Sequence, residues 1–223
     1  NHYLGYSEFI EFIKERHAEG HIEFYNNGYD HSSGSGWTEF SATGYGFQKS
    51  HFEIGQTLAQ QVLNFPFTAF NATFNTSDAD TITVVNESDA CEIWLFGPTS
   101  GSNVPVLRRI GGEIESSAGI PSWNTFIASY GAHRPVIVLQ HHAGRQTFAD
   151  GFAQFQQIID YLIGQQVTFI QPTEYARLIT DGMLPLDPQA DSDADGISDR
   201  HEGHADSDQD GLPDFLDPDS LSS

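Results

Sequence analysis

Two acidic segments near the carboxyl terminus have the spacing of a calcium-binding loop. Such a loop needs alternate oxygen ligands, a glycine that turns the chain at position 6 and a closing acid at position 12. At the ligand positions the first segment has Asp191, Asp193, Asp195, Ile197, Asp199 and Glu202, and the second has Asp206, Asp208, Asp210, Leu212, Asp214 and Asp217. Gly196 and Gly211 fill the two turn positions. We therefore expect two calcium sites here, rather than an acidic tail that serves only as a solvated surface.

The composition changes where these loops begin. From Asp187 onward there are 12 acids and one base, Arg200, which predicts a domain boundary between residues 186 and 187. Pro213 and Pro218 argue against the long flanking helices of a paired EF-hand. The loops instead resemble thrombospondin type 3 calcium repeats of secreted bacterial proteins. Residues 187–223 are thus expected to be a calcium-binding extension of a secreted, periplasmic or cell-surface protein.

Histidines are the second set of residues that could do chemistry. His141 and His142 follow an apolar run over residues 136–139, and His31 follows a short strand expected over residues 21–25. Neutral imidazole binds zinc, and histidine can exchange protons near neutral pH. Neighbouring strand residues point to opposite faces, so only one of His141 and His142 is expected to reach a shared site.

Hydrophobic periodicity predicts the elements that position these groups. Helices are expected over residues 6–19, 51–63, 123–130 and 152–164, and from Pro172 onward. Strands are expected over 21–25, 65–71 with an interruption at Pro66, 82–85, 93–96, 136–139 and 167–170, while residues 32–48 read as a long loop and 104–110 as an edge strand or a loop. Alternating strands and helices predict an α/β fold with a parallel sheet, either open or closed into a barrel. Such sheets place their chemistry at the carboxyl ends of the strands.

Residues 1–186 contain three segments that resemble motifs of the polysaccharide deacetylase family, carbohydrate esterase family 4. HIEFYNNGYDH is similar to the family's metal-binding Asn and His-x-x-x-His motif, with His31 at the second histidine and Asn27 at the first. FPFTAFN is similar to a segment that shapes the substrate groove, through Pro66, Phe67 and Asn71. VIVLQHHAG is similar to the Leu-x-His motif; Leu139 and His141 fit it directly, whereas a Gln-x-His reading selects His142.

The resemblance implies a distorted (β/α) barrel that removes acyl groups from amino sugars with a divalent metal, most simply zinc. His31 and Asn27 would hold the metal, His141 or His142 would protonate the leaving amine, and Asp30, Asp150 or Glu174 would give support. Tyr29, Trp37, Tyr45 and Trp123 are candidates for stacking on sugar rings. The family's first motif, a pair of aspartates, is not present in the chain: either it would lie upstream of Asn1 or the chain never had it.

The leading expectation is therefore a secreted, metal-dependent deacetylase of a polysaccharide or an amino-sugar oligosaccharide. The alternative is a non-catalytic carbohydrate-binding or cell-surface protein that keeps the fold and uses the tail for attachment. A third hypothesis is a tail that docks a cell-envelope partner through its calcium repeats.

The charge and composition of the chain exclude several other classes of protein. A net charge of −22, from 31 acids and 9 bases, disfavours nucleic acids and anionic membranes as partners. No apolar run is long enough to predict a membrane span. Cys91 is the single cysteine, which excludes an internal disulfide framework, and we expect it to be a buried apolar residue.

Overall fold

The computed structural model of the chain describes residues 7–98, 100–108, 114–130, 136–141, 146–183, 195–203, 205–208 and 213–217. These residues belong to two compact units. Unit 1 comprises Asn1–Leu107, Gln171–Leu184 and His204–Ser223, and unit 2 comprises Arg108–Ile170 and Pro185–Gly203. The boundary expected between residues 186 and 187 lies outside the described residues.

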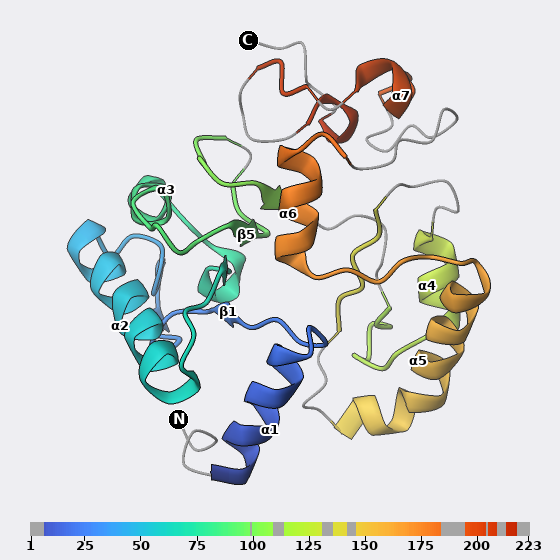
Figure 1. Ribbon diagram of the computed structural model, residues 1–223, viewed down its shortest axis with the longest axis horizontal. Coiled ribbons are helices and arrows are strands. Elements are labelled where there is room, and N and C mark those ends of the chain that lie inside the picture. Colours follow the sequence, from blue (N-terminus) through green and yellow to red (C-terminus); the bar gives the residue numbers. More distant parts are fainter. Residues whose placement is uncertain are drawn as a thin grey trace. The chain divides into compact units, whose positions relative to one another are not determined.

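Unit 1 is built on a parallel sheet of four short strands in the order β1-β4-β5-β6 (Figure 1). The strands are β1 (Tyr25–Asn26), β4 (Ala69–Phe70), β5 (Ile93–Leu95) and β6 (Val106–Leu107). Strands that are neighbours in the sheet also follow one another along the chain, apart from the hairpin described below. Their carboxyl ends therefore lie at one edge, and the expected α/β class with a parallel sheet is confirmed.

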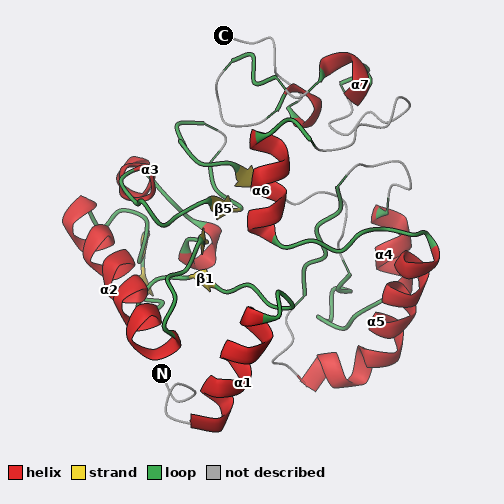
Figure 2. Cartoon of the chain, viewed as in Figure 1, coloured by secondary structure: helices red, strands yellow, loops and turns green. Residues whose placement is uncertain are grey.

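Helices connect the first strands of this sheet (Figure 2). Helix α2 (Tyr45–Leu63) follows β1, α3 (Ala79–Asn86) follows β4, and the two helices pack together. Side chains from both helices and from alternate strand positions form the core of unit 1, which contains Phe40, Phe52, Phe70, Ala72, Val84, Val85, Cys91, Trp94 and Val106. Burial of these apolar side chains holds the strands in register.

The segment before β1 is hydrogen-bonded to a helix that follows residues 108–170 of unit 2 in the sequence. Helix α1 (Ser7–Ala18) ends before Gly20, and α6 (Pro172–Thr180) packs against β5 and β6. The Glu23 carboxylate accepts hydrogen bonds from the Thr173 N–H at 3.1 Å and the Thr173 hydroxyl at 3.2 Å. The Thr68 hydroxyl donates to the same carboxylate at 3.1 Å. The negative charge of Glu23 at the first turn of α6 also interacts favourably with the helix dipole.

Residues 82–85 were predicted as a strand, and this prediction is wrong because they lie in α3. Asp78 caps this helix by accepting hydrogen bonds from the N–H groups of Asp80 and Thr81. The Thr81 hydroxyl in turn accepts a hydrogen bond from the Asp78 N–H, which completes a capping box. Local capping and packing against α2 outweigh the strand preference of the β-branched residues.

The long loop predicted over residues 32–48 is also more ordered than expected. Strands β2 (Ser33–Gly34) and β3 (Trp37–Thr38) form an antiparallel hairpin, and α2 begins already at Tyr45. Gly34 faces the Trp37 indole so closely that a Cβ atom there would collide with the ring. This cross-strand contact explains how a segment rich in Gly and Ser can form a hairpin.

Unit 2 contains α4 (Trp123–Ser129) and α5 (Gln146–Gly164). Its core consists of Ile114, Phe126 of α4, and Ile158 and Leu162 of α5. The predicted strands over 136–139 and 167–170 are wrong, since these described residues carry no strand. A strand needs a neighbouring strand to satisfy its backbone groups. The bridge residues in the described part of unit 2 are isolated: Glu115 pairs with Pro121, and Gln140 is a single bridge residue after 136–139.

The acidic segment contributes short elements to both units: α7 (Asp199–Glu202) belongs to unit 2 and the 3-10 helix η3 (Asp214–Leu216) to unit 1. Phe215 within η3 is completely buried. The carboxyl-terminal segment therefore contributes to packing, which a purely solvated tail would not do. Among the described residues, no helix is both long and apolar enough to cross a membrane.

Candidate functional site

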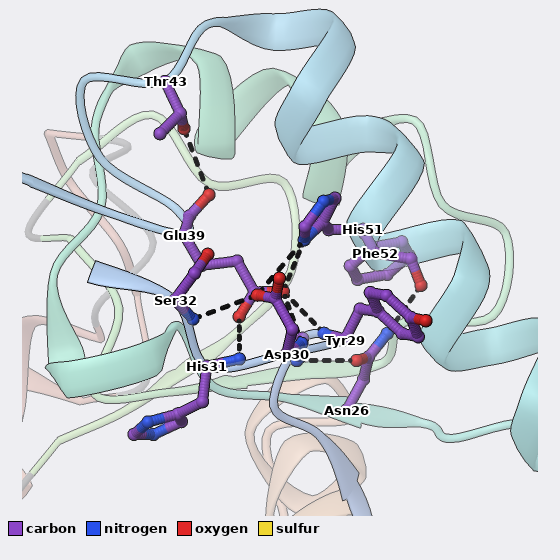
Figure 3. A network of polar contacts seen from close by, with 10 residues as sticks. Asn26, Tyr29, Asp30, His31, Ser32, Glu39, Thr43, His51 and Phe52 are labelled. Carbon is purple, nitrogen blue, oxygen red and sulfur yellow. Dashed lines mark hydrogen bonds and ion pairs between the residues drawn. The ribbon is translucent and has the colours of Figure 1, made fainter. Parts of the chain in front are cut away.

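The segment that leaves β1 wraps around a buried carboxylate (Figure 3). Residues 27–31, called the pocket loop below, approach Glu39, whose side chain is 0% exposed. Glu39 Oε1 accepts hydrogen bonds from the N–H groups of Tyr29 at 2.6 Å and Asp30 at 3.3 Å, and Oε2 accepts one from the His31 N–H at 2.9 Å. A buried carboxylate needs donors that replace its water. The three amides supply them, and Glu39 in return fixes the path of the loop.

His51 on α2 lies next to the same carboxylate. Its Nδ1 is 2.9 Å from Glu39 Oε1 and 3.6 Å from Asp30 Oδ1. The Phe47 ring stacks on the imidazole with centroids 3.9 Å apart, and the Tyr29 ring meets it edge-on at 5.6 Å. Two aromatic neighbours therefore hold the imidazole in one orientation.

Asp30, Glu39 and His51 each offer a ligand atom, and these atoms lie within 4.8 Å of one another. Two carboxylate oxygens and one imidazole nitrogen are a donor set that divalent transition ions accept. When His51 carries a proton on Nδ1, this atom donates a hydrogen bond to Glu39 Oε1, with the Asp30 carboxylate 3.6 Å away. The pocket loop lines an open pocket of about 530 Å³ beside them.

The two predicted metal ligands lie in this loop but point elsewhere. The His31 ring turns away from Glu39 and packs on Phe74, with centroids 4.4 Å apart (Figure 3). Asn27 Nδ2 donates a hydrogen bond to the backbone oxygen of Asn71 at 2.9 Å. Asn27 and His31 therefore line the pocket, whereas the gathered ligand atoms come from Asp30, Glu39 and His51.

The predicted substrate-binding residues are divided between the two ends of β4. Asn71 follows this strand and lies against Asn27 at the carboxyl edge, where it is largely buried. Pro66 and Phe67 precede the strand, and the backbone of Phe67 is bound by the Gln56 side chain. Tyr29 lines the pocket and is 42% exposed. Of the four residues, Tyr29 and Asn71 are at the pocket edge of the sheet.

Unit 2 holds the described member of the predicted histidine pair. His141 Nδ1 is 3.2 Å from Glu115 Oε1, and both side chains are largely buried. This contact favours the tautomer with the proton on Nδ1. The acceptor is Glu115 rather than Asp30, Asp150 or Glu174. His142 lies outside the described residues.

Comparison of the chain with protein-family models, curated proteins and solved structures finds no match. The resemblance to polysaccharide deacetylases therefore rests on the motifs in the sequence.

The calcium-type loops are described in part. In the first loop, Asp195 Oδ1 accepts a hydrogen bond from the Ile197 N–H at 2.7 Å, and Gly196 has φ 98°. The carboxylate of Asp199 is not among the described side chains, and Glu202 ends α7. Asp191 and Asp193 lie outside the described residues. A positive φ at position 6 is the turn that a calcium loop requires, and glycine adopts it without strain.

In the second loop, Asp214 and Asp217 are 8% and 2% exposed. The Ser207 N–H and hydroxyl each donate to the Asp214 carboxylate at 2.7 Å. Asp206 and Asp208 are described as well, and Asp210 and Leu212 lie outside the described residues. The closing part of the loop is therefore folded into unit 1.

Sequence reasoning missed Glu39, His51 and Glu115. Glu39 falls in a segment that reads as a loop, and His51 was expected only as the first residue of a helix. The contacts of Glu39 join residues 8 to 12 positions apart through the hairpin and α2. A buried Phe40 beside Glu39 marks a packed segment, but no local pattern identifies the partners.

Proposed function

We propose that the chain is a metal-dependent hydrolase that removes acyl groups from a polysaccharide or an amino-sugar oligosaccharide. Asp30, Glu39 and His51 hold its divalent ion in this proposal. The observation that carries it is the convergence of these side chains beside the segment that leaves β1, at the carboxyl edge of a parallel sheet. That edge is where α/β enzymes place their reacting groups.

The donor set suits zinc, and also manganese or cobalt, because it combines one imidazole with two carboxylates. A divalent ion there would polarise an acyl carbonyl and acidify a water molecule. The sequential order of the parallel strands supports the distorted barrel that the sequence resemblance implies.

Other residues of unit 1 would bind the sugar. Tyr29 lines the pocket and is 42% exposed, and Asn27 lines the same pocket. Aromatic faces and amide groups are suited to sugar rings and hydroxyls.

Calorimetric titration with zinc tests which side chains hold the ion. The wild type should bind one zinc ion tightly, and His51→Ala and Asp30→Asn should weaken binding strongly. His31→Ala should bind as the wild type does, because its ring points away from the ligand group. His21→Ala, which changes an exposed histidine, is the matched control. Loss of binding in His31→Ala with full binding in His51→Ala would instead support Asn27 and His31 as the metal ligands, as expected from the sequence.

Acetate release from acetylated chitooligosaccharides tests the reaction. The zinc-loaded wild type should release acetate, and His51→Ala should release far less. Binding of these sugars without acetate release would favour the alternative, a carbohydrate-binding or cell-surface protein that keeps the fold without the chemistry.

We also propose that the carboxyl-terminal loops bind calcium and stabilise a protein that works outside the cytoplasm, with a cell-envelope partner as a further role for the tail. Support comes from the two ligand patterns and from the φ of Gly196. Calcium should raise the melting temperature of the full chain, and Asp214→Asn should reduce this shift. A melting temperature that does not respond to calcium would contradict a structural role of the loops.

A further inference from the structure

Glu39 has two roles at once: with Asp30 and His51 it forms the ligand group, and it anchors the pocket loop. Its carboxylate faces His51 and Asp30 and also accepts the backbone N–H groups of Tyr29, Asp30 and His31 (Figure 3). Asp30 likewise contributes a ligand atom through its side chain and a hydrogen bond to Glu39 through its backbone. Binding of an ion by Asp30, Glu39 and His51 would therefore affect the pocket loop through the Glu39 carboxylate.

The pocket loop needs this carboxylate to keep its conformation. Gly28 has φ 82°, and a Cβ atom built on it would lie 2.5 Å from Glu39 Oε2. His31 has φ 57°, which a residue with a side chain adopts only when its surroundings hold it there. Gly28 directly precedes the three amides that donate to Glu39, and His31 carries the last of them. Without that anchor the loop is expected to relax.

An ion can share Glu39 without displacing the loop. A carboxylate oxygen has two acceptor directions, and Oε2 accepts the His31 N–H. A cation between Glu39, Asp30 and His51 would draw the first two side chains together. Asp30 is part of the loop, so this contraction would hold residues 29–31 more firmly against Glu39.

We propose that Glu39 couples ion binding to the conformation of the pocket loop, so that occupancy of the ligand group orders the wall formed by residues 28–31. This inference rests on the proposed function, because it needs an ion at Asp30, Glu39 and His51. Glu39 is thereby a positioning residue for the pocket as well as a ligand. Loop order and ion affinity depend on each other, as linkage requires.

Amide exchange measured by NMR tests the coupling in the wild-type chain. Zinc should slow exchange of the Tyr29, Asp30 and His31 amides by about tenfold or more, because local opening then requires loss of the ion. The Asn103 amide, which is bound by Asn86 in a separate loop, should exchange unchanged and serves as the internal reference.

The variant Gly28→Ala tests the coupling in the opposite direction. It removes no ligand atom but pushes a methyl group into the Glu39 carboxylate, and it should weaken zinc binding by about tenfold or more. Gly36→Ala is the matched control: Gly36 has φ 81°, and a Cβ atom there would meet nothing within 4 Å. This control carries the same backbone strain without touching Glu39.

The outcomes separate this inference from the proposed function. If zinc binds the wild type but neither slows the loop amides nor distinguishes Gly28→Ala from Gly36→Ala, the coupling is wrong and the metal site stands. If zinc does not bind the wild type, both are wrong. The exchange measurement needs no variant, so poor folding of Gly28→Ala would leave the test intact.

Discussion

Replacement of Glu39 by glutamine should destabilise unit 1 in the absence of any ion. The side chain keeps its size, but the negative charge and one acceptor oxygen are lost at a fully buried position. Oε1 has the most donors, since the Tyr29 and Asp30 amides and His51 Nδ1 all approach it. The glutamine oxygen is therefore expected to take this place, which turns its NH₂ group toward the His31 N–H.

The size of the effect follows from these contacts. Each hydrogen bond to a charged acceptor contributes about 1 kcal/mol more than one to a neutral acceptor, and an unsatisfied buried N–H costs about 1–3 kcal/mol. Burial of a neutral amide costs less than burial of a carboxylate, which offsets part of this loss. We expect a net loss of about 3 kcal/mol in the free energy of unfolding. For a chain of this size that corresponds to a melting temperature lower by about 6–12 °C.

Thermal unfolding in the presence of EDTA measures this effect without a contribution from bound ions. Glu87→Gln is the control, because it makes the same chemical change in an exposed carboxylate that pairs with Lys49. Exposed pairs contribute little, so its melting temperature should change far less. Equal shifts in the two variants would refute the view that Glu39 anchors the pocket loop.

Two further predictions concern Asp78 and Cys91 in unit 1. Partial burial alone would raise the pKa of Asp78, but hydrogen bonds from the Ala42 N–H, the Gln48 amide and the first turn of α3 outweigh it and lower the pKa. This stability is present above the unfolded pKa of about 3.9 and is lost as the pH falls through the folded value, so Asp78→Asn should lower the urea midpoint at pH 7, and the difference from the wild type should shrink as the pH falls below about 4. Burial raises the pKa of Cys91 to about 12, so the native thiol should resist a thiol reagent at pH 8 and react only on unfolding. Rapid labelling of the native chain would contradict its buried position.

Local signals were sufficient for most helices and insufficient for several strands. The apolar spacing of α1 and the proline that begins α6 identify these helices without tertiary information. The β-branched run in α3 and the apolar run over 167–170 misled because strand formation depends on a neighbouring strand. Periodicity cannot report whether such a neighbour exists.

The candidate site divides in the same way. The rule that parallel sheets place polar groups at their carboxyl ends located the segment after β1, where the pocket loop lies. The partners Glu39 and His51 were not predictable, because a hairpin and the first turns of α2 bring them to that segment. A buried acid in a segment rich in Gly and Ser has no periodic signature.

The bond between Glu23 and Thr173 bears on how the protein is made. These residues are 150 positions apart, and residues 108–170 of unit 2 lie between them. A ribosome releases Glu23 and the sheet strands long before α6 emerges, so the growing chain must carry an incomplete unit 1 while unit 2 is synthesised. Contacts of such long range slow folding and expose apolar surface in the meantime. Synthesis stopped before residue 171 should therefore leave a chain that chaperones retain, whereas the full chain can close unit 1 around α6 and add residues 204–223.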